Sequence, residues 1–301
     1  MRGHDHGPRT AERTLTGWAW LSIAAAVSTI GLKGGAYLLT GSVGLLSDAL
    51  ESVVNLVAAI LALIALRIAA RPPDATHPFG HGKAEYLSAG AEGMMILVAA
   101  GVIVYSAISR LVTPEPLEDL GLGLTITAVA TVINGLVGVL VLRAGRRHRS
   151  SALVADGHHL LTDVWTSVGV LVGLALVAVT GWLPLDSIVA LGVAANIMWV
   201  GGRIVVSATH GLMDHALDAD DVRLVTTCTD DVLAGHPQVR IHGIQTRQSG
   251  QQRFVSLHVE VPGDWSVARG HAVLDEIEGA LAHALPGVVV HTHLEPLDSG
   301  H

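Results

Sequence analysis

Four ionisable residues open a long apolar stretch, "LVADGHHLLTDVWTSVGVL", at residues 153–171. If this stretch is a helix, His159 and Asp163 share one face because they are four residues apart, and Asp156 extends the same stripe. His158 then faces another side. Ionisable side chains inside a membrane cost several kcal/mol each unless they are paired. The stretch therefore requires a pore, a partner side chain or a bound ion.

An earlier apolar stretch, "LLSDALESVVNLV" at residues 45–57, repeats this spacing, so the pattern D-x-x-[E/H]-x-x-x-[N/D] occurs twice. Two helices that each offer two nitrogen or oxygen ligands can form the four-coordinate site that Zn²⁺ or a similar first-row divalent ion favours. The alternative is a buried polar network that only holds the two helices together. The predicted ligands are Glu51, Asn55, His159 and Asp163, with Asp48 and Asp156 as supporting neighbours.

The elements that must position these residues are membrane helices. Of the 301 residues, 50% are hydrophobic and 15% are charged, and the mean hydropathy is +0.51, which is typical of an integral membrane protein. Lys and Arg are concentrated before the first apolar stretch and in alternate loops after it, so the positive-inside rule predicts that both termini are cytoplasmic. Six stretches are long enough to cross a hydrocarbon core of about 30 Å. They are residues 16–39, 44–69, 86–111, 119–142, 152–180 and 184–207.

Charge and rare residue types narrow the function further. The formal net charge is −8 without a long basic stretch, so no nucleic acid is expected as a partner. The single Cys228 excludes an intramolecular disulfide and a cysteine metal cluster, whereas 17 histidines indicate metal or proton chemistry. Lys33 and Glu92 lie within predicted spans and are functional candidates without a predicted partner. His4 and His6 are expected in a disordered tail.

After residue 214 the composition changes to that of a soluble domain. The pattern predicts a small cytoplasmic α/β domain with helix, strand, strand, helix and strand at residues 222–233, 239–247, 254–261, 267–285 and 288–294. The valine and leucine residues of "RFVSLHVEV" alternate and should share the core face, with His258 opposite. The predicted parts are a cytoplasmic tail (1–15), a six-helix transmembrane domain (16–209), the cytoplasmic domain (210–295) and a final tail (296–301).

Two further groups of residues are candidates for metal binding. The loop "RPPDATHPFGHGKAE" offers Asp74, His77 and His81, although a structured turn would explain the same residues. The soluble domain offers five histidines from its strands and one helix, for which scattered surface histidines are the alternative. These five are His242, His258, His271, His291 and His293.

Four segments taken together resemble the cation diffusion facilitator family, specifically its bacterial zinc and ferrous-iron efflux branch. They are "GSVGLLSDALESVVNL", "DATHPFGHGKAEYLSA", "ALVADGHHLLTDVWTS" and "GIQTRQSGQQRFVSLHVEV", and the resemblance covers nearly the whole chain. It implies a homodimer in the inner membrane with six transmembrane helices and a cytoplasmic ferredoxin-like domain. It also implies export of divalent metal against an inward flow of protons.

The resemblance also assigns the outlying candidates. Asp74, His77 and His81 match the family's auxiliary loop site. The residues that match the family's binuclear site at the dimer interface are His242, His258, His291 and His293. At the last of these positions the family more often has Asp. His271 matches a further histidine near that site.

The chain departs from the family pattern in the first half of the membrane site. The family usually has Asp or His where Glu51 stands, and Asp where Asn55 stands. Asn55 offers a neutral amide oxygen that cannot take up a proton. Because oxygen ligands are harder than imidazole, the departure favours Fe²⁺ or Mn²⁺ more than a His-rich site would, with Zn²⁺ still the first expectation and Co²⁺ and Cd²⁺ as further candidates.

These features predict metal transport by alternating access. Metal ligands must be deprotonated, so metal binding releases protons, and His159 is the best exchanger because the ordinary pKa of imidazole, about 6.5, is close to physiological pH. The soluble domain is expected to act as a metal sensor. An intramembrane metal hydrolase would need a motif such as H-E-x-x-H, which does not occur. A metal sensor or scaffold that does not translocate would use the same ligands and stays open as the alternative.

Overall fold

The computed structural model describes residues 8–40, 43–112, 121–182 and 184–297. Within these ranges the side chain of Asp48 is not described, and His4 and His6 lie outside them. The chain divides into two compact units, Met1–Thr209 and His210–His301. Each unit is described below by itself.

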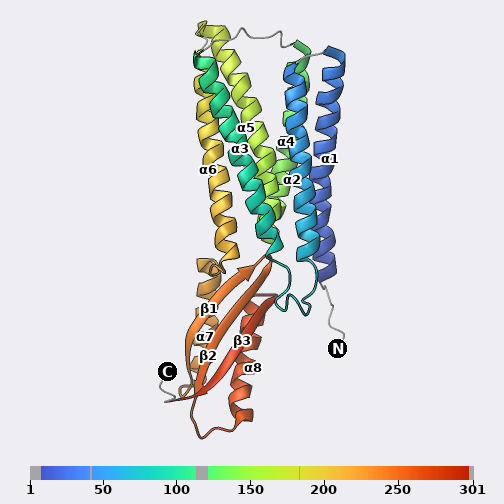
Figure 1. Cartoon of the computed structure of the whole chain (residues 1–301). Coiled ribbons are helices and arrows are strands. Elements are labelled where there is room, and N and C mark those ends of the chain that lie inside the picture. The colour runs from blue at the N-terminus through green and yellow to red at the C-terminus, as the bar shows by residue number, and fades with distance from the viewer. Residues whose placement is uncertain (1–7, 41–42, 113–120, 183, 298–301) are drawn as a thin grey trace. The chain divides into compact units, whose positions relative to one another are not determined.

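The first unit consists of long helices that run side by side in alternating directions (Figure 1). Among the described residues, five helices are long and apolar enough to cross a membrane; α5 is not one of them, so the sixth span remains a prediction. Large apolar side chains point outward along these helices, among them Leu38, Tyr105 and Val179. Such a surface is stable only in an apolar solvent. The helices are α1 (Pro8–Thr40), α2 (Val43–Ala69), α3 (Ala84–Val112), α4 (Gly121–His148), α5 (Ser151–Thr180) and α6 (Pro184–Leu212).

Contacts between the helices bring α2, α4 and α5 together. Helix α4 packs along α5, and α1 packs along both α2 and α4, while α5 also contacts α2 and α3. Two residues join α4 to α5: Arg149, which has a positive φ of 55°, and Ser150, whose Oγ caps the first turn of α5 by accepting from Leu153 N. The Ser150 hydroxyl also donates to Glu85 of α3. The beginning of α5 is therefore fixed to two neighbouring helices.

Close packing of α4 against α5 depends on Gly157. A Cβ at this position would lie 2.7 Å from Leu142 N and 2.8 Å from Leu142 Cα, and neither backbone atom can move aside easily. Gly157 is adjacent to the polar stripe of α5, so this contact sets how the stripe faces its neighbours.

We expect the substitution Gly157→Ala to lower the stability of the first unit by about 1–3 kcal/mol through overpacking. Thermal unfolding of the purified protein in detergent measures this effect. Gly101→Ala is the matched control, because a Cβ there has nothing within 4 Å and alanine favours helix over glycine. Equal melting temperatures for the two variants would contradict the packing role of Gly157.

The second unit has the element order that the sequence predicts. Helix α7 (Ala219–Ala234) is followed by β1 (Arg240–Ser249), β2 (Gln252–Val261), α8 (Val267–Ala284) and β3 (Val288–Pro296). The sheet has the order β1-β2-β3, with β1 antiparallel and β3 parallel to β2 (Figure 1). The predicted core face of β2 is confirmed, since Val255, Leu257, Val259 and Val261 are at most 5% exposed. The ferredoxin-like assignment remains a prediction.

A bulge in β1 shapes the opposite face of this sheet. The register between β1 and β2 shifts after the pair His242–His258, and Gly243 within the bulge has a positive φ of 62°. A Cβ at Gly243 would lie 3.5 Å from the His258 ring. Glycine thus permits the backbone turn and lets the two imidazole rings lie 5.1 Å apart, centroid to centroid.

Candidate metal sites

The structure brings three of the four predicted membrane ligands together. Asn55 of α2 lies between two residues of α5: its Oδ1 is 2.7 Å from Nε2 of His159, and its amide donates to Oδ2 of Asp163. Asn134 of α4 donates to the same Asp163 oxygen at 3.3 Å. Asn55 and His159 are 2% and 5% exposed, so the cluster is buried between three helices.

Two buried atoms in this cluster have lone pairs that no described residue satisfies. A carbonyl oxygen can only accept, so Nε2 of His159 carries the hydrogen shared with Asn55, and the lone pair is on Nδ1. His159 Nδ1 and Asn134 Oδ1 are buried, and within the described residues they have no hydrogen-bond partner. The side chains of Asn55, Asn134, His159 and Asp163 supply nitrogen and oxygen atoms of the kinds that divalent cations bind.

Glu51 and Asp156 are not gathered into this cluster. Glu51 is exposed in the single chain. Among the described residues, ligand atoms of Glu51, His159 and Asp163 do not all lie within 4.8 Å of one another. Asp156 is buried, but its Oδ1 accepts from Ser22 of α1 at 3.0 Å. Membership of Glu51 in the site therefore stays a prediction, and Asp156 contacts a different helix.

Asn134 was not predicted from the sequence. It is 2% exposed and lies on α4, in an apolar stretch where the polar residues at helical spacing, Thr127 and Thr131, are not ionisable and do not indicate a metal site. Only the packing of α4 along α5 shows that its amide reaches Asp163.

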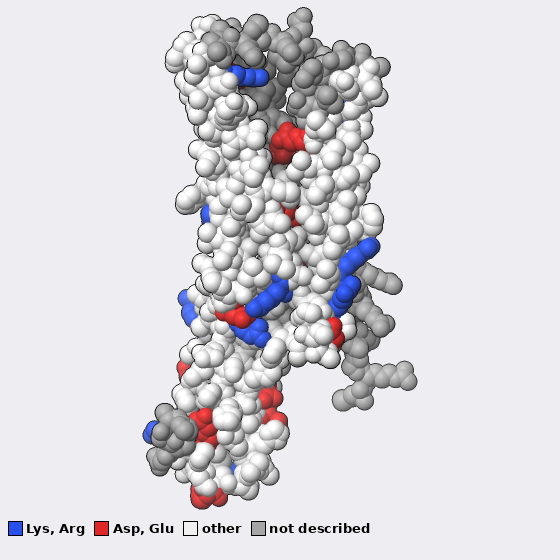
Figure 2. All heavy atoms as spheres, viewed as in Figure 1, with Lys and Arg blue, Asp and Glu red and all other residues white. Residues whose placement is uncertain are grey.

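Acidic side chains are visible in the hollow between the helices of the first unit, whereas Lys and Arg gather mainly at one end of it (Figure 2). The sequence places Arg67, Arg71 and Lys83 around the α2–α3 connection. It places four arginines near the α4–α5 connection: Arg143, Arg146, Arg147 and Arg149. Arg110, at the end of α3, pairs with Asp186 at 3.5 Å, which offsets its charge there.

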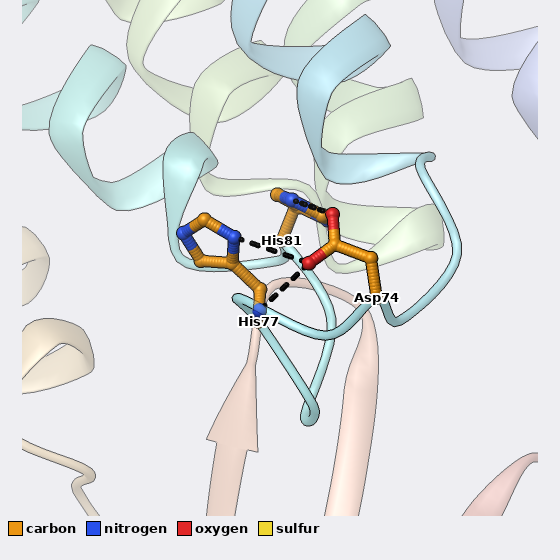
Figure 3. A group of neighbouring side chains, drawn as sticks. All are labelled: Asp74, His77 and His81. Carbon is orange, nitrogen blue, oxygen red and sulfur yellow. Dashed lines mark hydrogen bonds and ion pairs between the residues drawn. The ribbon is translucent and has the colours of Figure 1, made fainter.

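The loop between α2 and α3 brings Asp74, His77 and His81 together (Figure 3). One ligand atom of each lies within 4.8 Å of the others. His81 Nε2 is 3.4 Å from Asp74 Oδ2, His77 Nδ1 is 3.6 Å from Asp74 Oδ1, and the two ring centroids are 4.4 Å apart. His81 Nδ1 is buried without a partner among the described residues. Two imidazoles and a carboxylate are a common zinc ligand set.

Local hydrogen bonds hold Asp74 in position. The Thr76 hydroxyl donates to Asp74 Oδ1 at 2.7 Å, and the backbone N–H groups of Thr76 and His77 donate to it at 2.8 Å. These hydrogen bonds hold the pKa of Asp74 well below its ordinary value. The largest contribution comes from the Thr76 hydroxyl and the next from the His77 N–H. The loop therefore presents an ionised carboxylate in a fixed orientation.

The second unit has a cluster on the face of the sheet away from its core. The ligand atoms of His242, His258 and Glu295 lie within 4.8 Å of one another. Glu295 Oε1 is 2.8 Å from His258 Nδ1 and 3.5 Å from His293 Nε2, and Oε2 is 3.2 Å from His242 Nε2. Partial burial tends to raise the pKa of Glu295, but hydrogen bonds with the two nearest histidines outweigh it and lower the pKa.

The composition of this cluster differs from the one expected. Glu295 was missed, although extending the alternation of His291 and His293 by one step places it on the same face. His291 is opposite Ser256 in the sheet, two residues along the strands from the pair His258–His293. His271 is on α8, whose apolar side packs against the other face, and its imidazole pairs with Asp275 at 3.8 Å. Neither His271 nor His291 joins the described group.

We expect Glu295→Gln to weaken metal binding at this sheet cluster by at least about tenfold, because it removes the carboxylate shared by three histidines. Calorimetric titration of the full chain with Zn²⁺ measures the loss of one class of bound ions. Asp275→Asn is the control, since Asp275 pairs with a histidine outside the group. An unchanged titration of the Glu295→Gln variant would show that this cluster does not bind the ion.

The comparisons with known proteins place the chain in a family. Residues 19–213 match the model of the cation efflux transmembrane domain, and residues 227–297 match that of the cation efflux protein, cytoplasmic domain. The chain therefore belongs to the cation efflux family, as its motifs predicted, and is a transporter and not an enzyme.

Relatives of known sequence match most of the chain. An uncharacterized transporter of Synechocystis sp., sll1263, is 52% identical over 282 residues, which are 93% of this chain and 90% of the relative. The cation-efflux pump FieF of Escherichia fergusonii is 34% identical over 262 residues, covering 87% and 86% of the two chains. A solved structure described as that of "a Putative Zinc Transporter CzrB (Zn form)" is 31% identical, matches 29% of this chain and 98% of its own, and has a TM-score of 0.27.

Proposed function

We propose that this protein exports a divalent metal ion across the cytoplasmic (inner) membrane in exchange for protons. Zn²⁺ is the first candidate, and Fe²⁺, Mn²⁺, Co²⁺ and Cd²⁺ are alternatives. The observation that carries the proposal is the buried cluster of Asn55, His159 and Asp163, which joins α2 to α5 and includes one buried ring nitrogen, His159 Nδ1, without a hydrogen-bond partner among the described residues. The names of the FieF and CzrB relatives support efflux and zinc.

The proposed arrangement is a homodimer with six membrane spans and both termini in the cytoplasm. The cytoplasmic-domain match and the concentration of Lys and Arg at the α2–α3 and α4–α5 connections support it. The proposed domain boundaries are those predicted above: 16–209 for the membrane domain and 210–295 for the cytoplasmic domain.

In the proposed mechanism the metal ion replaces the hydrogen bonds that Asn55 makes without it. Asp163 supplies the negative charge, His159 supplies an imidazole nitrogen, and the amide oxygens of Asn55 and Asn134 are further ligands. Glu51 is the further predicted ligand. When the site opens outward, the ion leaves and His159 and Asp163 take up protons, whereas Asn55 takes up none.

The loop site and the sheet cluster are proposed as cytoplasmic metal sites. Asp74 is held ionised by its hydrogen bonds, and Glu295 by its histidines, so both can accept a cation at neutral pH. The proposed role of the sheet cluster is sensing: the metal favours one arrangement of the two subunits by binding it more tightly.

Flux measurements in proteoliposomes test the function. Entry of each candidate metal is followed with a trapped fluorescent indicator, with and without an imposed proton gradient, and Fe²⁺ is kept under anaerobic conditions. We expect metal entry that an opposed proton gradient accelerates and that moves protons the other way. Metal binding without flux would instead identify a non-translocating sensor, and flux that ignores the gradient would exclude proton exchange.

A further inference from the structure

Two buried carboxyl groups of the first unit take no part in the metal sites described above. Glu92 of α3 is 0% exposed and Asp156 of α5 is 1% exposed. One oxygen of each, Glu92 Oε2 and Asp156 Oδ2, is buried with no hydrogen-bond partner among the described residues. Buried polar atoms are nearly always hydrogen-bonded, so two such oxygens on neighbouring helices require an explanation.

The surroundings of the pair supply hydroxyl groups and apolar atoms. Ser22 of α1 donates to Asp156 Oδ1 at 3.0 Å, and Ser88, one turn before Glu92, donates to Glu92 Oε1 at 3.5 Å. An apolar cluster from α3, α5 and α6 flanks them. Its members include Ala89, Ile96, Ala155, Ile197 and Ile204.

The charge that acts on Glu92 across the α3–α5 contact is that of Asp156, and it has the same sign. Arg146 of α4, Arg203 of α6 and His158 of α5 are further charged or titratable groups, and helical spacing puts His158 on another side of α5 than Asp156 and His159. Other titratable groups on the helices packed around the pair include Glu85 of α3, which accepts from Ser150, Lys33 of α1, and His159 and Asp163 of α5. Lys33 is eleven residues from Ser22, about 16 Å along the helix.

We infer that Glu92 and Asp156 together bind a proton inside the membrane unit. One carboxylate becomes a carboxylic acid, whose O–H is a hydrogen-bond donor. Two like charges in an apolar environment are strongly unfavourable, and a single proton removes one of them and supplies a donor where two buried carboxylate oxygens lack one. A proton suits this site better than a metal ion, because the pair offers no nitrogen ligand and its nearby hydroxyls already donate to the carboxylates.

The position of the pair gives the proton a use. Asp156 is three residues before His159 on the same stripe of α5, about 4.5 Å along the helix. A proton held by the pair can pass to the metal cluster when the ion leaves it. This use rests on the proposed function, whereas proton binding by the pair does not.

Infrared difference spectroscopy of the full chain in lipid tests proton binding. The wild type is expected to show the C=O band of a protonated carboxyl at neutral pH, which disappears at alkaline pH. The double variant Glu92→Gln, Asp156→Asn keeps the shape of both side chains and should lack this band. The two single variants provide the same comparison if the double variant does not fold.

Asp186→Asn is the matched control, because Asp186 belongs to the same unit but is paired with Arg110. This variant should keep the band. A band that is absent from the wild type, or that persists in the double variant and in both single variants, would overturn the inference. Loss of one bound equivalent when the double variant is titrated with Zn²⁺ would also overturn it, since the pair would then be a metal site.

Flux measurements separate this inference from the proposed function. The double variant should transport metal in proteoliposomes, but the acceleration by an opposed proton gradient should fall several-fold. A normal response to the gradient would exclude the use of this proton in exchange. Absence of metal flux in the wild type would contradict the proposed function and leave the infrared result to decide on proton binding.

Discussion

Replacing Asp163 with alanine is expected to lower metal flux by at least about 100-fold, the largest effect of any single substitution considered. Asp163 contributes the one carboxylate of the buried cluster and accepts hydrogen bonds from both Asn55 and Asn134. Its removal takes away the negative charge that balances the cation and leaves two buried amides without their acceptor. The initial rate of Zn²⁺ entry into proteoliposomes measures the effect.

His158→Ala is the control for this prediction. His158 is on the same helix, but helical spacing puts its side chain on another side than His159 and Asp163. The control should keep about half or more of the wild-type flux, as expected for a residue outside the site. If Asp163→Ala transports metal as fast as the control, the cluster is a structural network and the transport site lies elsewhere.

The second large effect is expected from Asn55→Asp, which restores the residue that the family pattern has at this position. A carboxylate there adds negative charge to the cluster and removes the amide that now donates to Asp163. We expect the affinity for divalent ions to rise by at least about tenfold, because the charge of the ligands sets affinity for a dication. The order of preference among Zn²⁺, Fe²⁺ and Mn²⁺ should also change.

Two further variants bracket this result. Asn55→Ala removes both contacts and should weaken metal binding, and Asn134→Ala should weaken it less, since its amide is farther from Asp163, at 3.3 Å. Metal titrations in detergent and competitive flux assays report affinity and preference separately. An Asn55→Asp variant with the wild-type order of preference would show that this position does not select the ion.

Much of the fold could be predicted from the sequence, because long apolar stretches and alternating strands have strong periodic signals. The order of elements in the second unit and the buried face of β2 follow from such alternation. The helical spacing of His159 and Asp163 likewise predicted a shared face, and both contact Asn55.

Contacts between distant elements could not be predicted in the same way. Asn134 belongs to neither copy of the pattern that recurs in the sequence. Its hydrogen bond to Asp163 depends on the close packing of α4 along α5. Spacing placed Glu51 one turn from Asn55, but it could not show that Glu51 is exposed in the single chain. Glu295 was not predicted, although it continues the alternation of His291 and His293, and His271 lies on α8, whose apolar side packs against the other face of the sheet.

The two-residue connection between α4 and α5 has a consequence for biosynthesis. Four arginines near the connection keep it on one side of the membrane, and a turn of two residues, Arg149 and Ser150, does not let the helices separate. In the proposed six-span arrangement the two helices therefore enter the bilayer as one hairpin. An aspartate near the centre of a lone helix opposes insertion by about 2.5–3.5 kcal/mol. Within the hairpin, Asp163 already has Asn134 as a hydrogen-bond partner, so the nascent chain can insert α5 before the rest of the bundle has assembled.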